Sequence, residues 1–179
     1  MKNTSQIDRL KQIVETLRSE NGCPWDKAQT HASLKPGCIE EAAEVIGGIN
    51  ILEETGDAEN LKEELGDLLL QVMFHSVMAE EEGLFTFDDV VKTISDKMER
   101  RHPHVFSDVK FDSEEELHAA WAEIKKQEKE GKEWYADYLP GAFNEAHKFI
   151  DKAQERKGRQ REKRLSFCPD SFQDRKSVV

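Results

Sequence analysis

The sequence predicts an all-α protein, and both its composition and its hydrophobic pattern support this. Apolar residues make up 37% of the 179 residues and charged residues 35%, whereas the chain contains only 10 glycines and 5 prolines. Such a composition favours helices over turn-rich β structure. Apolar residues recur at helical spacing and are expected to be buried, among them Ile46, Ile49, Leu61, Leu65, Leu68, Leu69 and Val72. We therefore expect an antiparallel helical bundle with one core and short loops.

Five helices are expected in the first 130 residues. The first ends at "NGCP", the second starts with Pro36 at its first helical position, and the third ends before Gly83. "TFDD" at Thr86 and "SEEE" at Ser113 match the Ser/Thr-x-x-acid capping pattern, which marks two further helix starts. The expected helices span residues 6–20, 36–54, 57–82, 87–101 and 114–129.

Residues 131–179 form a basic extension to the domain expected over residues 1–130. Between Lys148 and Lys176 there are 10 basic and 5 acidic residues, which leaves 16 basic and 32 acidic residues for the rest of the chain. Residues 141–164 can form one amphipathic or solvated helix. The last fifteen residues, from Leu165, show no periodicity and are expected to be loop or disordered.

The charge and the apolar runs of the chain exclude several classes of function. A net charge of −11 argues against general nucleic-acid binding, because phosphates would be repelled. The longest apolar run, "LLLQVMF", is too short to span a membrane. The start lacks the apolar segment of a signal peptide, and the three widely spaced cysteines fit reduced thiols. We therefore expect a cytoplasmic protein.

Two neighbouring helices each carry an acidic pair beside an apolar stripe. Glu41 and Glu44 lie three residues apart in "EEAAEV", and Glu64 and Asp67 lie three apart in "EELGD". Residues at this spacing share a helix face, whereas Glu40 points about a hundred degrees away from Glu41. Since only a short turn separates the two helices, they should pack antiparallel and gather the four carboxylates.

Such a cluster of acids predicts a site for divalent cations. Like charges about 5 Å apart repel by roughly 3 kcal/mol at an effective dielectric constant of 20, and a metal ion would relieve this. Oxygen ligands favour a hard ion, Mg²⁺ or Mn²⁺, which is commonly completed by phosphate groups of a substrate. The alternative remains open, because a Glu-x-x-Glu pair in an acidic chain is often only solvated helix surface.

The motifs "EEAAEV" and "EELGDLLLQVMFH" resemble the EExxE and ExxD signature of the MazG-type nucleoside triphosphate pyrophosphohydrolases. "NGCPWDKAQTH" and "ISDKMERRHPHVF" are similar to two further segments of that family, so the resemblance covers roughly residues 5–130. It implies an all-α bundle of the all-α NTP pyrophosphatase type, which usually dimerises. It also implies Mg²⁺-dependent hydrolysis of a nucleoside or deoxynucleoside triphosphate to the monophosphate and pyrophosphate.

The resemblance also implies roles for individual residues. Glu41, Glu44, Glu64 and Asp67 match the metal-binding acids, and Glu40 and Glu41 are the candidate catalytic residues, with Glu40 a water-activating base or outer ligand. Lys97, Arg101, Trp121 and Lys125 match residues that bind the nucleotide. From the residues alone, Trp121 can equally be a core anchor and Lys125 a surface lysine. We expect a salt-bridge or surface role for Arg100 and a hydrogen-bonded role for His75.

Two alternative functions are consistent with an acidic helical bundle. A di-iron or di-manganese carboxylate protein also places acids in a four-helix core, but such proteins typically use Glu-x-x-His, and the third residue after the first acid here is Glu44 or Asp67. A non-enzymatic helical interaction protein would bind neither Mg²⁺ nor nucleotide.

Overall fold

The computed structural model describes residues 5–167, and these residues form helices and turns without any strand. The all-α prediction is therefore confirmed. In chain order the helices are α1 (Gln6–Arg18), α2 (Pro24–Lys27), α3 (His31–Thr55), α4 (Glu59–Glu81), α5 (Phe87–Arg101), α6 (Pro103–Phe106), α7 (Glu114–Gln127), the 3₁₀ helix η1 (Glu133–Tyr138) and α8 (Leu139–Phe167).

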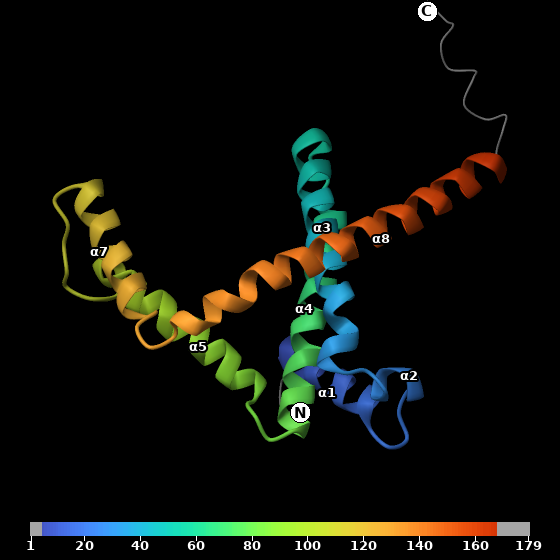
Figure 1. The fold of residues 1–179 in the computed structure, drawn as a ribbon, viewed down its shortest axis with the longest axis horizontal. Helices are drawn as coiled ribbons and strands as arrows, with labels where there is room; N and C mark the ends of the chain where they lie inside the picture. Colours follow the sequence, from blue (N-terminus) through green and yellow to red (C-terminus); the bar gives the residue numbers. More distant parts are fainter. Residues whose placement is uncertain (1–4, 168–179) are drawn as a thin grey trace, which may run out of the picture.

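The helices α3 and α4 form the central hairpin of the fold (Figure 1). Gly56, with φ of 76°, ends α3 in the left-handed conformation that glycine adopts without strain. The two helices approach closely at Gly48, where an added Cβ would lie 2.8 Å from the Cα of Leu61. This close approach brings the acidic faces of α3 and α4 together.

A small core lies between α1 and one end of α4. Val14 of α1 packs with Met73, Phe74 and Val77 of α4, and all four are buried. Ion pairs reinforce this packing, with Lys11 to Glu80 at 2.8 Å and Arg18 to Glu81 at 2.7 Å. The N-terminal helix thus fixes the base of the hairpin.

The helices α5, α6 and α7 form an arm that leaves the hairpin, and α8 returns from it. α5 contacts α4 near its start and packs against α7, while α7 contacts neither α3 nor α4. The long helix α8 starts beside the arm at η1 and crosses α3 (Figure 1). The arm thus extends away from the hairpin, and α8 runs from the end of the arm back to α3.

Some helix boundaries differ from the prediction. α3 begins at His31 rather than Pro36, because Thr30 and Ser33 form a reciprocal capping box, with Ser33 N donating to Thr30 Oγ1 and Thr30 N to Ser33 Oγ. Pro36 therefore lies inside the helix, although it lacks the N–H of an intrahelical bond. The capping starts at Thr86 and Ser113 are confirmed.

At the C-terminal end the helix extends further than the sequence indicated. α8 runs to Phe167, so the loop expected from Leu165 is wrong for residues 165–167. Residues 168–179 lie outside the described residues, so the loop or disorder expected for them stays a prediction. None of the described helices is both long and apolar enough to cross a membrane.

Several apolar side chains of the hairpin are exposed in the single chain, although the sequence pattern predicted them to be buried. Ile46 is 60% exposed and Leu65 50% exposed. Ile49, Leu69 and Val72 are exposed as well. The predicted burial of these side chains is therefore wrong within a single chain. The described helices cover only part of the apolar stripe along α3 and α4.

Candidate functional site

Three carboxylates converge across the α3–α4 hairpin. Glu41 comes from α3, whereas Glu64 and Asp67 come from successive turns of α4, and one oxygen of each lies within 4.8 Å of the others. All three are half-buried. Asn60 donates a hydrogen bond of 2.9 Å to Glu64 and so restrains one side of the cluster. The antiparallel hairpin thus brings together three of the four acids predicted to bind metal.

The electrostatics of this cluster favour a cation. Burial raises the pKa of Glu41 above its ordinary value, and the charges of Glu44, Asp67, Glu40 and Glu64 raise it further. A bound cation would reverse this penalty by stabilising the ionised carboxylates. The donors are all carboxylate oxygens, which suits Mg²⁺ or Mn²⁺ better than a metal that prefers histidine or cysteine. The residues present therefore fit a hard divalent ion.

Glu40 and Glu44 face the basic helix α8 instead of the three-acid cluster. Arg156 pairs with Glu40, and Lys157 pairs with Glu44. Lys157 Nζ also lies 3.7 Å from Glu40. The hydrogen bond from Arg156 holds the pKa of Glu40 below its ordinary range. Arg156 and Lys157 were not predicted as site residues. Their one signal in the sequence is the surplus of basic residues between Lys148 and Lys176.

The predicted nucleotide-binding residues gather in the arm. Lys125 Nζ lies 4.2 Å from the ring centroid of Trp121, and the guanidinium carbon of Arg101 lies 5.9 Å from it. Both distances are within the range of cation–π interactions. Trp121 is 38% exposed, so it is not a fully buried core anchor. The indole of Trp121 thus lies near two cations, one from α5 and one from α7.

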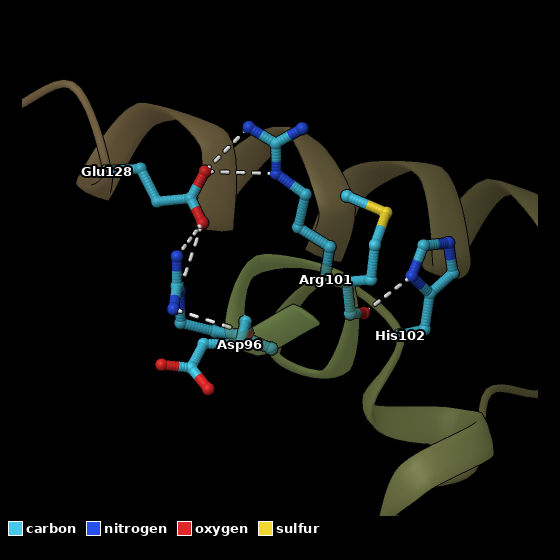
Figure 2. A network of polar contacts seen from close by, with 6 residues as sticks. Asp96, Arg101, His102 and Glu128 are labelled. Carbon is cyan, nitrogen blue, oxygen red and sulfur yellow. Dashed lines mark hydrogen bonds and ion pairs between the residues drawn. The ribbon is translucent and has the colours of Figure 1, made fainter. Parts of the chain in front are cut away.

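Arg100 and Arg101 converge on a single carboxylate, that of Glu128. Figure 2 shows Arg101 beside this carboxylate. Arg100 donates to one oxygen of Glu128 at 2.5 Å and Arg101 to the other at 2.6 Å. These hydrogen bonds hold the pKa of Glu128 below its ordinary range, and the bond from Arg101 contributes most. The salt-bridge role expected for Arg100 is confirmed, and Arg101 shares the same partner.

A cavity of about 1090 Å³ opens between α5, α7 and η1. Its volume is at the upper end of the range for small-molecule sites. Lys97 and Arg101 line it, whereas Trp121 and Lys125 are not among its lining residues. Further polar and aromatic groups on its wall are Arg100, Lys129, Lys132 and Tyr135.

The acids and the cations lie in different parts of the single chain. α7 contacts α5 but neither helix of the hairpin, and α5 leaves α4 near its start (Figure 1). Lys97 and Arg101 lie in the second half of α5, away from that junction. The structure therefore brings three of the four metal-binding candidates together on the hairpin and places the nucleotide-binding candidates on the arm, but it does not join the two groups.

His75 lies on α4 beside the hairpin seam and is hydrogen-bonded, as expected. Its Nδ1 lies 2.7 Å from Nδ1 of His31, and its Nε2 lies 3.5 Å from the sulfur of Cys38. Burial lowers the pKa of His75, and the neighbouring His31 lowers it further. A neutral imidazole is consistent with a structural role between α3 and α4.

Comparison with known proteins assigns this arrangement to a family. Residues 29–106 match the MazG nucleotide pyrophosphohydrolase domain. The chain is 50% identical over 126 residues to a nucleoside triphosphate pyrophosphohydrolase of Escherichia coli K12, an alignment that covers 70% of this chain and 46% of the relative. The chain therefore contains a MazG domain.

The chain is also similar to other bacterial proteins. The chain is 50% identical over 123 residues to the nucleoside triphosphate pyrophosphohydrolase/pyrophosphatase MazG of Thermotoga maritima, covering 69% of this chain and 45% of the relative. It is 52% identical over 124 residues to the uncharacterized protein YabN of Bacillus subtilis, covering 69% of this chain and 24% of the relative. The chain thus spans less than half the length of these curated relatives.

The boundaries of the MazG match divide the candidate residues. The acids of α3 and α4 lie inside residues 29–106, and so do Lys97 and Arg101. Trp121 and Lys125 lie beyond them, as do Arg156 and Lys157 of α8. The cations that contact Glu40 and Glu44 are therefore supplied from outside the matched part of the MazG domain.

Proposed function

We propose that the protein is a Mg²⁺-dependent nucleoside triphosphate pyrophosphohydrolase, which converts a nucleoside or deoxynucleoside triphosphate to the monophosphate and pyrophosphate. The observation that carries this proposal is the convergence of Glu41, Glu64 and Asp67 within a MazG domain. Of the residues that the structure describes, only carboxylates form this cluster. This argues against a di-iron or di-manganese carboxylate protein, which typically uses Glu-x-x-His.

In the proposed mechanism Glu41, Glu64 and Asp67 hold Mg²⁺, with Mn²⁺ as a possible substitute, and Glu44 completes the set. When bound, the ion neutralises phosphate oxygens and makes a water molecule more acidic. Glu41 would orient this water toward the α-phosphorus, and Glu40 would act as the water-activating base or as an outer ligand. To accept a proton, Glu40 must first leave its pair with Arg156, because this pair lowers its pKa.

The arm supplies the groups proposed to bind the nucleotide. Lys97 and Arg101 neutralise the triphosphate. Its roughly four negative charges require cations in addition to the metal. The exposed face of Trp121 stacks on the base, and Lys125 binds beside it. For Arg101 to bind a phosphate it must share or leave the Glu128 carboxylate.

We further propose that the protein functions as a homodimer in which the arm of one copy reaches the hairpin of the other. Two observations support this. The acids and the cations do not meet within one chain, and the exposed Ile46, Leu65 and neighbouring apolar residues leave a face on the hairpin that a second copy can cover.

Product analysis in H₂¹⁸O tests the proposed reaction. Purified protein is incubated with each common NTP and dNTP and Mg²⁺, and the products are resolved by mass spectrometry. We expect monophosphate and pyrophosphate, with ¹⁸O in the monophosphate because water attacks the α-phosphorus. Label in pyrophosphate would show attack at the β-phosphorus, and formation of diphosphate and phosphate would refute cleavage between the α and β phosphates.

Matched substitutions test the residues. Glu41→Gln and Asp67→Asn should each lower turnover at least about a hundredfold, because loss of even an outer partner of a metal site can cost 10–100-fold. Glu63→Gln removes an exposed charge next to Glu64 on the same helix and should retain activity. Full turnover in the first two variants would exclude the proposed metal site.

A further inference from the structure

The basic helix α8 contacts the one predicted metal ligand that is missing from the three-acid cluster. Glu44 follows Glu41 by three residues on α3, yet its carboxylate pairs with Lys157 Nζ. Glu41, Glu64 and Asp67 lie together without it. The position of Glu44 therefore depends on a residue 113 positions further along the chain.

The packing of α8 on α3 determines where Lys157 lies. Ile39 and Ala43 of α3 face Ile150 and Ala153 of α8 across a small cavity, which Glu44 and Lys157 also line. A further ion pair, Lys35 to Glu145 at 3.0 Å, joins the same two helices nearer the start of α8. Apolar and charged contacts thus fix α8 along α3, so the cation next to Glu44 is part of the tertiary structure.

Lys157 and a divalent cation would compete for the same carboxylate. A metal at Glu41 and Asp67 would attract Glu44 into the cluster, whereas Lys157 attracts it toward α8. If Glu44 turned toward the metal with Lys157 following it, two cations would be brought close together in a half-buried site, which Coulomb repulsion disfavours. Glu40 offers Lys157 a second carboxylate at 3.7 Å, so the lysine has an alternative partner when Glu44 leaves.

We propose that Lys157 is a positioning residue that holds Glu44 away from Glu41, Glu64 and Asp67 until a divalent cation displaces it. This inference rests on the proposed function, since it requires that these acids bind the metal. Its consequence is that α8 lowers the affinity of the site for the free ion. Since exposed or partly exposed ion pairs contribute up to about 1 kcal/mol, Lys157 should weaken metal binding about two- to fivefold.

Binding of Mn²⁺, measured by electron paramagnetic resonance of the free ion without nucleotide, tests this proposal. Lys157→Gln should lower the dissociation constant about two- to fivefold, because Glu44 is released to the metal. Lys157→Arg keeps the cation and should bind Mn²⁺ like the wild type. Lys152→Gln removes an exposed charge from the same helix and should also leave the constant unchanged. Circular dichroism checks that each variant retains its helices.

A double-mutant cycle distinguishes direct competition at Glu44 from a general effect of removing a positive charge. In a Glu44→Gln background, Lys157→Gln should no longer tighten Mn²⁺ binding. Equal tightening in both backgrounds would overturn the proposal, as would wild-type or weaker affinity in the single variant. If the wild type binds Mn²⁺ and Glu41→Gln weakens it, the proposed metal site stands whatever Lys157 does. Absence of Mn²⁺ binding to the wild type would overturn both.

Discussion

At the proposed metal site, the carboxylate of Glu41 lowers the stability of the metal-free fold when it is ionised, although the ionised form is the one that would bind a cation. Its pKa is raised by burial and by the acids around it, so the metal-free fold is more stable when this carboxyl is protonated. At neutral pH the ionised side chain therefore costs stability that a bound cation would restore. This is a common property of functional carboxylates, which are placed where they destabilise the unliganded protein.

The stability of the metal-free protein should therefore depend on pH through Glu41. The favourable contribution of the protonated carboxyl is fully present below its unfolded pKa of about 4.3 and is lost as the pH rises through the raised folded value. In EDTA, the Tm of Glu41→Gln should exceed that of the wild type by an amount that grows as pH rises through this window. Thermal melts by circular dichroism between pH 4 and pH 8 measure this difference.

Glu63→Gln is the control, since Glu63 is exposed on the same helix as Glu64 and lies outside the cluster. Its Tm should follow that of the wild type at every pH. Adding Mg²⁺ at neutral pH should raise the Tm of the wild type more than that of Glu41→Gln. A difference between Glu41→Gln and wild type that stays constant with pH would contradict the role assigned to Glu41.

At the residue scale the sequence predicted the acids but not their cationic partners. The spacing of Glu64 and Asp67 places both on one face of α4, and the short turn after Thr55 brings Glu41 opposite them. These are local consequences of helical geometry. The pairs of Glu40 and Glu44 with α8 depend on the direction in which a distant helix crosses α3, and no local periodicity encodes this direction.

At the scale of the helices, the packing of α3 on α4 depends on the close approach of Gly48 to the backbone of Leu61. Gly48 is buried, and a Cβ there would lie 2.8 Å from the Cα of Leu61. Backbone atoms cannot move aside as a flexible side chain can, so a larger residue must push the helices apart. The acids of the cluster come from these same two helices, which makes Gly48 a determinant of their spacing.

Gly48→Ala should therefore destabilise the protein by about 1–3 kcal/mol, the usual cost of overpacking, and weaken Mn²⁺ binding. Gly47→Ala is the matched control, because a Cβ at Gly47 meets no heavy atom within 4 Å. It should stabilise the helix by about 0.5–1 kcal/mol. Urea denaturation at one protein concentration measures both, and equal stability of the two variants would refute the close-approach argument.

Helix starts were predicted where the capping chemistry is local and unambiguous. Thr86 and Ser113 accept hydrogen bonds from Asp89 N and Glu116 N as the pattern indicates. At α3 two signals competed, and the capping box of Thr30 determined the start despite Pro36. Burial was harder to predict, because periodicity identifies an apolar face such as that of Ile46 and Leu65 without specifying whether the same chain covers it.

At the scale of the whole molecule, mixing inactive subunits tests whether the arm of one copy serves the acids of the other copy in the proposed homodimer. Coexpressed Glu41→Gln and Arg101→Ala chains form mixed dimers, each with one site that combines intact acids and intact cations if the arm crosses between copies. Random association into symmetric dimers should restore about a quarter of wild-type activity. Turnover of the copurified mixture is compared with that of each variant alone.

Coexpression of Glu41→Gln with Asp67→Asn provides the control, since both substitutions affect the acid cluster and no mixed dimer contains a complete site. This pair should remain inactive. If sedimentation shows dimers but the first pair also remains inactive, the cations do not serve the acids of the other copy.

The contacts of α8 with α3 affect where a domain boundary can be drawn in this chain. A boundary at residue 130 would separate Glu40 and Glu44 on α3 from Arg156 and Lys157, which neutralise them. Residues 1–130 by themselves would keep the acids of α3 and α4 but lose these neutralising charges. Helix α8 is thus an electrostatic part of the acidic site, even though it lies outside the residues that match the MazG domain.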